Sequence, residues 1–387
     1  MKILIVAEAD PDHEASGAER VLARHCAGLA ARGHAVTLLA GVKDGAPQAE
    51  ERREGITIVR YRLTPAAALE PVRLSHRVAP SEGFDVVLCY QPFSALAFLL
   101  GPWRRYLPAG YVFLSPWHEE FQVRHPSAAS LSLWVRRALE GVVLRRCRRL
   151  FPLSRFMADR LIRLHGVPAE RVRVVPAGVD PVRFAPALDR EAVRRRLGLQ
   201  PSGTLFFTLR NLEPRMGIDR LLQAVPLVAR ALPDFVLVVG GQGPLLPSLR
   251  ALAKELGIEE RVRFTGFIPE DQLVSYYQAA DGFVIPTVEL EGFGLPILEA
   301  MACGTPALGS RVGAIPELLE PFDPSLLLSA PTPEGIAEGI LALAGRPDGD
   351  SLRIACREYV VSRYRWETVL EQLERELLEV ATSEGAR

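Results

Sequence analysis

Two glutamates, Glu291 and Glu299, lie eight positions apart in the segment PTVELEGFGLPILEAMACGTPALGS, residues 286–310. A short β-branched run ends just before this segment, and its glycines favour a turn. Pro296 then stands where the first turn of a helix tolerates a missing N–H. Free N–H groups at such a helix start, together with the helix dipole, bind anions. The segment therefore predicts a site that suits a diphosphate, formed around Phe293, Gly294, Leu295 and Ile297.

Glu299 is the only charged residue within residues 295–303. A buried carboxylate is costly unless it finds hydrogen-bond donors. Ribose hydroxyls would supply such donors, and a structural hydrogen bond to a neighbouring backbone group is the alternative. A hydrolase would need two carboxyls about 5–9 Å apart on opposite walls of a cleft. Here the two glutamates belong to one anion pocket, which disfavours a hydrolase.

The elements that must position this pocket are short apolar runs that alternate with helical patterns along the chain. Such alternation is typical of doubly wound parallel sheets, whose ligands bind beyond the carboxyl ends of the strands. The helical patterns include residues 18–31, 131–149 and 154–165, with Ser154 as the N-cap of the last. The expected strands cover residues 3–7, 35–40, 56–60, 86–89, 111–114, 150–153 and 172–175, followed by 204–209, 235–240, 262–266, 282–286 and 306–310.

The domain organisation is predicted from residues 176–203, where the alternation of strands and helices is interrupted by prolines at positions 176, 181, 186 and 201. This segment is the expected hinge. The sequence thus predicts an N-terminal Rossmann-like domain over 1–185 and a C-terminal one over 200–363, with a cleft between them. The segment 364–387 is expected to pack back on the first domain through a helix whose apolar stripe is Trp366, Val369, Leu370, Leu373, Leu377 and Leu378.

The composition limits which partners and sites are expected. The 46 basic and 46 acidic side chains cancel, which argues against nucleic acid as a partner. The five cysteines show no C-x-x-C spacing, so neither a zinc site nor a disulfide framework is expected. The N-terminus begins as a strand rather than a signal peptide, and no run reaches the ~20 apolar residues of a membrane span. A cytoplasmic protein is expected.

The block EGFGLPILEAMACGTP resembles the Glu-x7-Glu signature of the retaining glycosyltransferases of family 4. Other segments resemble that family in the same order, namely SGAER (16–20), RGHAVTLLA (32–40), VVPAGVDPVRF (174–184), VGGQGP (239–244) and YRW (364–366). In SGAER, Ser16 replaces the usual second glycine. The resemblance covers essentially the whole chain. It implies the GT-B fold, a nucleotide diphosphate sugar as donor, retention of anomeric configuration and no cofactor or bound metal.

The resemblance also implies roles for individual residues. Glu291 would contact the sugar hydroxyls, and Glu299 would hold the ribose. Phe293, Gly294 and Leu295 would line the sugar and the β-phosphate. Ile268 would contact the base, and Gly17 would approach the phosphate from the first domain.

Two departures from the family pattern concern catalysis. In RNLEPRMG (210–217) Arg210 matches the diphosphate arginine, whereas Met216 replaces the usual lysine beside Arg215. Because the leaving phosphate is an anion, Arg210 is the expected catalytic cation, and Arg215 is either a second one or a solvated turn residue. In YVFLSPWHEE (111–120) Leu114 replaces the usual histidine. His118 is then either a substitute in the site or a surface residue.

Several alternatives stay open. The arginines at 136, 137, 145, 146, 148 and 149 form either a solvated basic face or a peripheral contact with an anionic membrane. The acceptor is unidentified. A nucleotide-sugar 2-epimerase shares the expected architecture, and a degenerate, non-catalytic sugar-nucleotide binder would fit the changes at Leu114 and Met216. A dehydrogenase is disfavoured because GGQGPLL (240–246) lacks the third glycine of a dinucleotide fingerprint.

Overall fold

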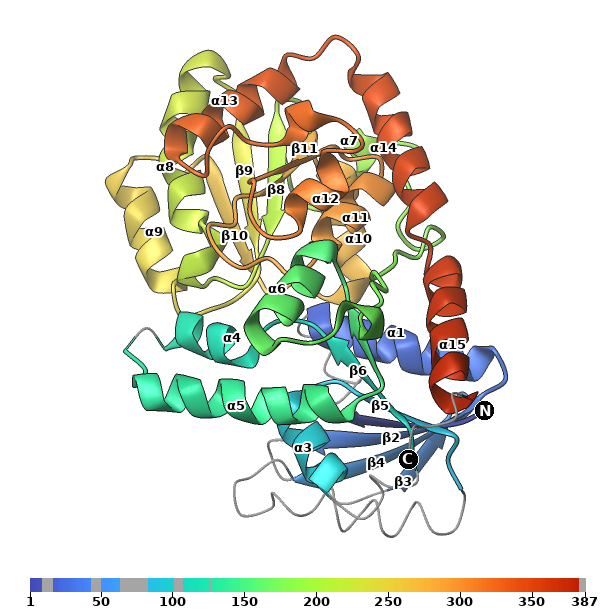
Figure 1. The fold of residues 1–387 in the computed structure, drawn as a ribbon. Coiled ribbons are helices and arrows are strands. Elements are labelled where there is room, and N and C mark those ends of the chain that lie inside the picture. Colours follow the sequence, from blue (N-terminus) through green and yellow to red (C-terminus); the bar gives the residue numbers. More distant parts are fainter. Residues whose placement is uncertain (9–16, 43–49, 63–82, 101–106, 126, 383–387) are drawn as a thin grey trace. The chain divides into compact units, whose positions relative to one another are not determined.

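The computed structural model describes residues 1–8, 17–42, 50–62, 83–100, 107–125 and 127–382. It divides the chain into two compact units (Figure 1). Unit 1 comprises Met1–Ala177 and Trp366–Arg387, and unit 2 comprises Gly178–Arg365. The boundary lies at Ala177, so most of the segment expected to be a hinge belongs to unit 2. Ser16 lies outside the described residues.

Unit 1 is built on a seven-stranded sheet in the order β3-β4-β2-β1-β5-β6-β7. All its pairs are parallel except β3 with β4, which is antiparallel. Residues 3–7 of the central strand are buried, as their uninterrupted apolar run predicts. The strands are β1 (Lys2–Ala7), β2 (Ala35–Val42), β3 (Glu50–Arg53), β4 (Ile56–Arg62), β5 (Val86–Cys89), β6 (Ala109–Phe113) and β7 (Arg149–Pro152).

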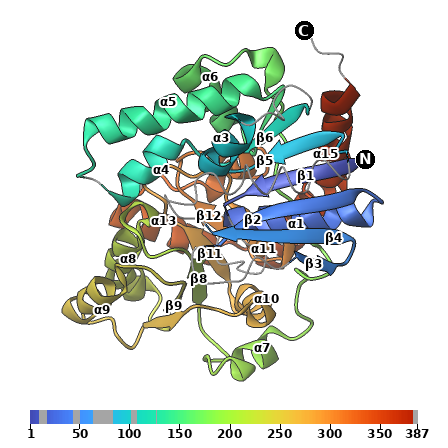
Figure 2. The ribbon, with the colours of Figure 1, turned by 90° about the horizontal axis from the view of Figure 1, so that it is seen from below.

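The helices of unit 1 form two groups. The first group packs on β2, β4, β5 and β6 and consists of α1 (Gly17–Ala31) and α15 (Trp366–Thr382). The second group is built around α5 and consists of α3 (Pro92–Leu100), α4 (Trp117–Arg124), α5 (Ser130–Arg146) and α6 (Arg155–His165), the last capped by Ser154 as expected. Figure 2 shows the strands of unit 1 beside one another.

Unit 2 is built on a five-stranded, fully parallel sheet in the order β10-β9-β8-β11-β12. Its strands are β8 (Leu205–Leu209), β9 (Val236–Gly240), β10 (Val262–Gly266), β11 (Gly282–Ile285) and β12 (Ala307–Gly309). One helix group consists of α8 (Ile218–Ala231), α9 (Leu246–Glu255) and α13 (Pro333–Ala344), and the other of α7 (Arg190–Arg196), α10 (Glu270–Ala279), α11 (Leu295–Ala302) and α14 (Gly349–Arg363). Figure 1 shows these groups on the two sides of the sheet, and α12 (Ile315–Leu319) follows β12.

The structure corrects several sequence expectations. Residues 172–175 form only an isolated bridge, at Val172, and two backbone hydrogen bonds beside β7. The helix expected over 131–149 ends at Arg146, because β7 begins at Arg149. The stripe of the last helix is buried in unit 1 except for Leu378, which is 43% exposed.

The segment expected to be a hinge contains helix α7 and is held by hydrogen bonds from two arginines, of which Arg194 is buried. Arg194, 5% exposed, contacts Asp281 at 2.8 Å and donates to the carbonyl of Ala279. Arg357 of α14 donates to the carbonyls of Pro181 and Phe184. These contacts fix the segment within unit 2.

Candidate functional site

The carboxyl edge of the unit 2 sheet brings together residues that are distant in sequence. Because all five strands are parallel, their carboxyl ends meet at one edge. Arg210 follows β8, Gly241 follows β9, Ile268 follows β10, and Thr287 follows β11. The Glu-x7-Glu segment continues from β11 into α11 at this same edge.

Arg210 is the charged centre of the site. Its side chain is 6% exposed, and Nη2 lies 2.5 Å from Oε2 of Glu291. The same nitrogen donates to the hydroxyl of Thr287 at 3.0 Å and lies 2.8 Å from the sulfur of Met216. Nε of Arg210 is buried and has no hydrogen-bond partner among the described residues. A buried guanidinium with an unused donor is expected where an anion binds.

The backbone of Glu291 is held in place by contacts with Gly313 and Ala314. Its carbonyl accepts from the N–H of Ala314 at 3.0 Å. Gly313 has a φ of 61°, and a Cβ there would lie 2.2 Å from the Glu291 carbonyl oxygen. Only glycine fits this contact, so the segment after β12 fixes the Glu291 loop. Glu291 and Arg210 were both expected in the site, and the structure brings their side chains together.

The loop after β9 packs closely on Arg210. Gly241 has a φ of 115°, and a Cβ there would lie 1.9 Å from the Arg210 carbonyl oxygen. Its N–H donates to the carbonyl of Gly266, while the N–H of Arg210 donates to Gly240. The glycines of GGQGP therefore serve close backbone packing around the site. Ile268, 6% exposed, lies beside Gly240 at the same edge.

One of the four N–H donors expected at the start of α11, that of Ile297, is not free. Gly294, with φ 99°, is the N-cap, and Pro296 lies in the first turn as expected. The N–H of Ile297 donates to the carbonyl of Gly294 at 2.9 Å, so it is not available to a ligand. Within the described ranges, no residue accepts from the N–H groups of Phe293, Gly294 or Leu295. These three remain as donors for an anion.

Glu299 is buried further inside α11, with 2% of the residue exposed. Its Oε2 accepts a hydrogen bond from the hydroxyl of Tyr277 at 2.8 Å. Tyr277 belongs to α10 and is completely buried. A side-chain hydroxyl is therefore one structural partner of Glu299, and a hydrogen bond to a neighbouring backbone group stays an expectation. Tyr277 and Thr287 were not found from the sequence, because a hydroxyl distant in sequence gives no spacing signal.

Arg215 and Met216 lie in the 3-10 turn Pro214–Met216. Arg215 is not a solvated turn residue: its Nη1 donates to the carbonyl of Leu290 at 2.6 Å. Its backbone carbonyl accepts from Val288. Leu290 has a positive φ of 54°, which is rare for a residue with a Cβ. Arg215 therefore supports the loop that carries Glu291.

His118 and Gly17 belong to unit 1. Gly17 is the first residue of α1. The side chain of His118 is 12% exposed and its Nδ1 has no hydrogen-bond partner in the described part of the chain. Burial, with His165, Arg137 and Arg160 nearby, lowers the pKa of His118 to about 4. His118 is therefore neutral at pH 7 and is not an ordinary surface histidine.

Helix α4, which carries His118, is fixed by a buried carboxylate of α5. Glu140 is completely buried, and its two oxygens accept from the N–H of Trp117, each at 3.2 Å. Burial raises the pKa of Glu140, although the adjacent His165 at 3.2 Å opposes the shift. Glu140 thus satisfies an otherwise unpaired donor at the start of α4.

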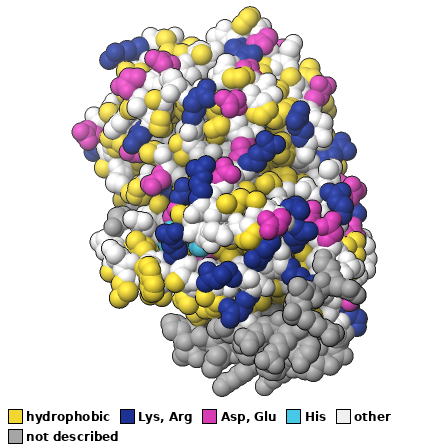
Figure 3. All heavy atoms as spheres, viewed as in Figure 1, with side chains coloured by type: hydrophobic (Ala, Val, Ile, Leu, Met, Phe, Trp, Pro, Cys, Tyr) yellow, Lys and Arg dark blue, Asp and Glu magenta, His cyan; other side chains and the backbone are white. Residues whose placement is uncertain are grey.

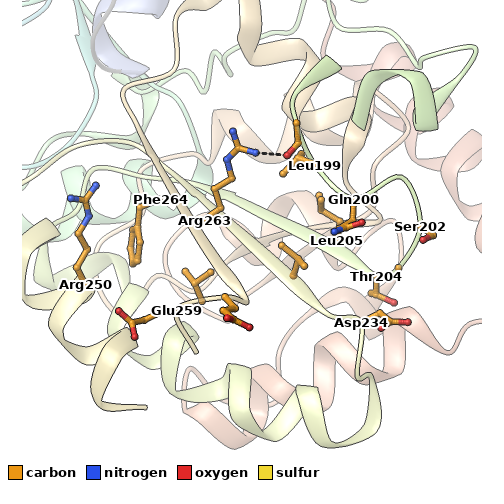
Figure 4. Close-up of a pocket in the computed structure, with 15 residues that line it drawn as sticks. Leu199, Gln200, Ser202, Thr204, Leu205, Asp234, Arg250, Glu259, Arg263 and Phe264 are labelled. Atoms are coloured by element: carbon orange, nitrogen blue, oxygen red, sulfur yellow. Dashed lines mark hydrogen bonds between the residues drawn. The ribbon is translucent and has the colours of Figure 1, made fainter. Parts of the chain in front are cut away.

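A shallow pocket of roughly 480 Å³ lies elsewhere in unit 2 (Figure 4). It is lined by Thr204, Val236 and Val262, at or next to the starts of three strands, and so lies at the amino edge of the sheet. Its wall carries charges of both signs, including Arg250 and Glu259. It does not include Arg210 or Glu291, and a parallel sheet binds ligands at the other edge.

Within the described ranges, no helix is both long and apolar enough to cross a bilayer. In the same residues, no group of three or more His, Cys, Asp and Glu side chains is arranged to hold a metal ion.

Comparisons with known proteins identify the class of enzyme. Residues 15–183 match the model of Glycosyltransferase Family 4, and residues 189–359 match Glycosyl transferases group 1. A GDP-mannose-dependent alpha-(1-6)-phosphatidylinositol monomannoside mannosyltransferase of Mycobacterium tuberculosis is 29% identical over 359 residues, which is 89% of this chain and 90% of that protein. A D-inositol 3-phosphate glycosyltransferase of Corynebacterium urealyticum is 37% identical over 215 residues, 52% of this chain and 50% of that protein.

Solved structures show the same fold. Sucrose-phosphate synthase from Thermosynechococcus elongatus has a TM-score of 0.83 at 21% identity, over 99% of this chain and 100% of that one. HepE of Anabaena in complex with UDP-glucose has a TM-score of 0.79 at 18% identity, over 98% and 100% of the two chains. The two family models follow one another along the sequence. The sheet of unit 2 falls within the second model, and every strand of the unit 1 sheet except β1 falls within the first. The chain is a glycosyltransferase of the GT-B fold, with a first half that matches the family 4 model and a second half that matches the group 1 model.

Proposed function

We propose that this glycosyltransferase transfers a sugar, with retention of anomeric configuration, from a nucleoside diphosphate sugar bound at the carboxyl edge of the unit 2 sheet. The observation that carries the proposal is the buried Arg210 guanidinium, whose Nε has no partner among the described residues. It lies in the same edge as the three free N–H groups at the start of α11. Together they suit two adjacent phosphates.

The proposed mechanism rests on charge. As the sugar leaves, negative charge develops on the diphosphate, and preorganised donors that face this charge lower the barrier. Arg210 and the N–H groups of Phe293, Gly294 and Leu295 are such donors, and they take the place of a metal ion in the proposal. Glu291 accepts from the sugar hydroxyls, and Glu299, oriented by Tyr277, accepts from the ribose.

The donor sugar is proposed from the relatives. The mannosyltransferase of Mycobacterium tuberculosis is named as GDP-mannose-dependent. GDP-mannose is therefore the first donor to test here, with UDP-glucose as the comparison. The acceptor class is left to a screen that includes inositol phosphates and phosphatidylinositol mannosides.

The test has two stages. Binding of GDP, UDP and their sugars is measured by calorimetry, and the tightest donor is then assayed with the acceptors in the presence of excess EDTA. We expect a product whose anomeric proton coupling shows retention, and activity that survives EDTA. Turnover of the donor alone to its 2-epimer would instead identify an epimerase. Tight donor binding without product for any acceptor would identify a degenerate binder.

A further inference from the structure

Helix α5 exposes large apolar side chains in its first turns. Leu131 is 71% exposed, Trp134 is 66% exposed and Val135 is 39% exposed. Their spacing of i, i+3 and i+4 places them on one face of the helix. Large apolar side chains gathered on one face of a surface helix mark an interaction site.

The same face ends in two exposed arginines. At about 100° per residue, Arg145 and Arg146 fall within about 60° of the line through Leu131. They lie about 20 Å further along the helix at 1.5 Å per residue. In the α5 region of Figure 3, hydrophobic side chains lie toward one end and Lys and Arg side chains toward the other. The face is therefore apolar at its amino end and cationic at its carboxyl end.

Acidic side chains do not cancel this charge. The only acidic residue of α5 is Glu140, which is completely buried. On the neighbouring helix α4, Glu119 pairs with Arg160, and Glu120 lies 3.0 Å from Arg124. The exposed charge of α5 is thus cationic.

Not every arginine of this segment is available to a partner. Arg136 lies 3.4 Å over the ring of Phe121, and Arg148 and Arg149 donate to the carbonyls of Val380 and Glu170. These three have structural roles. Arg145 and Arg146 in the last turn also balance the helix dipole, but the dipole gives no reason to expose Leu131 and Trp134.

We propose that this face of α5 docks on an anionic phospholipid bilayer. Leu131, Trp134 and Val135 enter the interface, where the tryptophan ring is favoured, and Arg145 and Arg146 contact the headgroups. Each basic residue near an anionic surface raises the partition coefficient about fivefold. Apolar insertion and cationic contact act together, as stable peripheral binding requires two signals.

Co-sedimentation of the full-length protein with vesicles tests the proposal. We expect binding to phosphatidylglycerol-containing vesicles, little binding to pure phosphatidylcholine, and loss of binding in high salt. The double variant Arg145→Glu with Arg146→Glu should bind at least about 25-fold more weakly. The double variant Leu131→Ser with Trp134→Ser should bind more than about tenfold more weakly.

Matched controls come from unit 2. Val182 and Leu188 are 89% and 109% exposed, so their double serine variant removes comparable exposed apolar surface. Arg230→Glu with Lys254→Glu makes the same charge change on exposed residues. Both controls should bind vesicles like the wild type, and all variants should keep their thermal midpoint and their binding of nucleoside diphosphate.

Four outcomes would overturn the proposal. The wild type could fail to bind anionic vesicles, or bind neutral vesicles equally well. The control variants could lose binding as strongly as the α5 variants. Sedimentation could show a wild-type dimer that becomes a monomer in Leu131→Ser with Trp134→Ser, which would make the face an interface between two copies.

Discussion

The ion pair between Arg210 and Glu291 leads to a prediction that separates binding from turnover. The two side chains are 6% and 12% exposed, and Nη2 and Oε2 lie 2.5 Å apart. If Arg210 binds the diphosphate, Glu291 is a negative charge next to the phosphates. We expect Glu291→Gln to bind nucleoside diphosphate more tightly than the wild type while its turnover falls.

The magnitudes follow from the geometry. Removal of one partner of a buried pair costs about 3–5 kcal/mol. Glutamine keeps a hydrogen-bond acceptor, and Thr287 still accepts from Arg210 at 3.0 Å. We therefore expect the free variant to lose only about 2–3 kcal/mol of unfolding free energy, because one hydrogen bond to the charged guanidinium is kept. At about 6 Å and an effective dielectric of about 20, two charges interact by about 3 kcal/mol. After screening, a gain of about 1–2 kcal/mol in diphosphate binding is expected, which is about 5- to 30-fold.

The assay combines calorimetry with GDP or UDP, thermal unfolding of the free protein and donor turnover. Glu289→Gln is the matched control, since Glu289 is exposed and makes the same change of charge two positions away. It should change none of the three measurements appreciably. An affinity of Glu291→Gln for diphosphate that is equal to or weaker than that of the wild type would refute the reasoning.

Three further predictions concern buried groups. Glu299→Gln should weaken nucleotide binding by about 1–3 kcal/mol in calorimetry. Tyr277→Phe keeps the carboxylate but removes one of its hydrogen-bond donors, and should weaken binding by about 0.5–1.5 kcal/mol. Met216→Lys places a second cation beside Arg210 at a position that is only 5% exposed. It should therefore lower the thermal midpoint of the free protein but increase the rise in thermal midpoint that added diphosphate causes. A change in midpoint that is the same with and without diphosphate would contradict this. Burial lowers the pKa of His25 to about 3. Between about pH 6.5 and pH 3, His25 is therefore protonated only in the unfolded chain. The unfolding free energy should then fall by about 2 kcal/mol from pH 7 to pH 5. This pH dependence should be smaller in His25→Gln, as measured by urea unfolding.

The fold was predictable where the pattern of burial follows the sequence. The run ILIVA is buried in β1, and Ser154 caps α6 by accepting from the N–H of Met157. Strand β3 was missed because its residues, EERR, are polar and exposed at the sheet edge. Its hairpin turn, Glu54–Gly55, has positive φ values of 49° and 79°, which is typical of a type I′ turn.

The site was predictable only in part. The sequence placed Arg210 and Glu291 in one pocket because each stands in a recognisable segment. It could not show that they pair with each other when no ligand is bound, nor that Thr287 accepts from Arg210 and Tyr277 donates to Glu299, because these contacts depend on three-dimensional packing. Nor could it decide the state of His118, whose low pKa comes from burial and from cations on α5 and α6.

The return of the C-terminal helix to unit 1 has a consequence for synthesis. Unit 1 consists of Met1–Ala177 and Trp366–Arg387, whereas unit 2 is one continuous stretch. Helix α15 covers α1 with Leu370 packed against Gly28, and Glu374 pairs with Arg32 at 2.6 Å. On the ribosome, unit 2 therefore has all of its residues before unit 1 does. Until α15 has been synthesised, the surface of α1 that receives Leu370 stays uncovered, and a nascent chain stalled before residue 366 presents that apolar surface to chaperones.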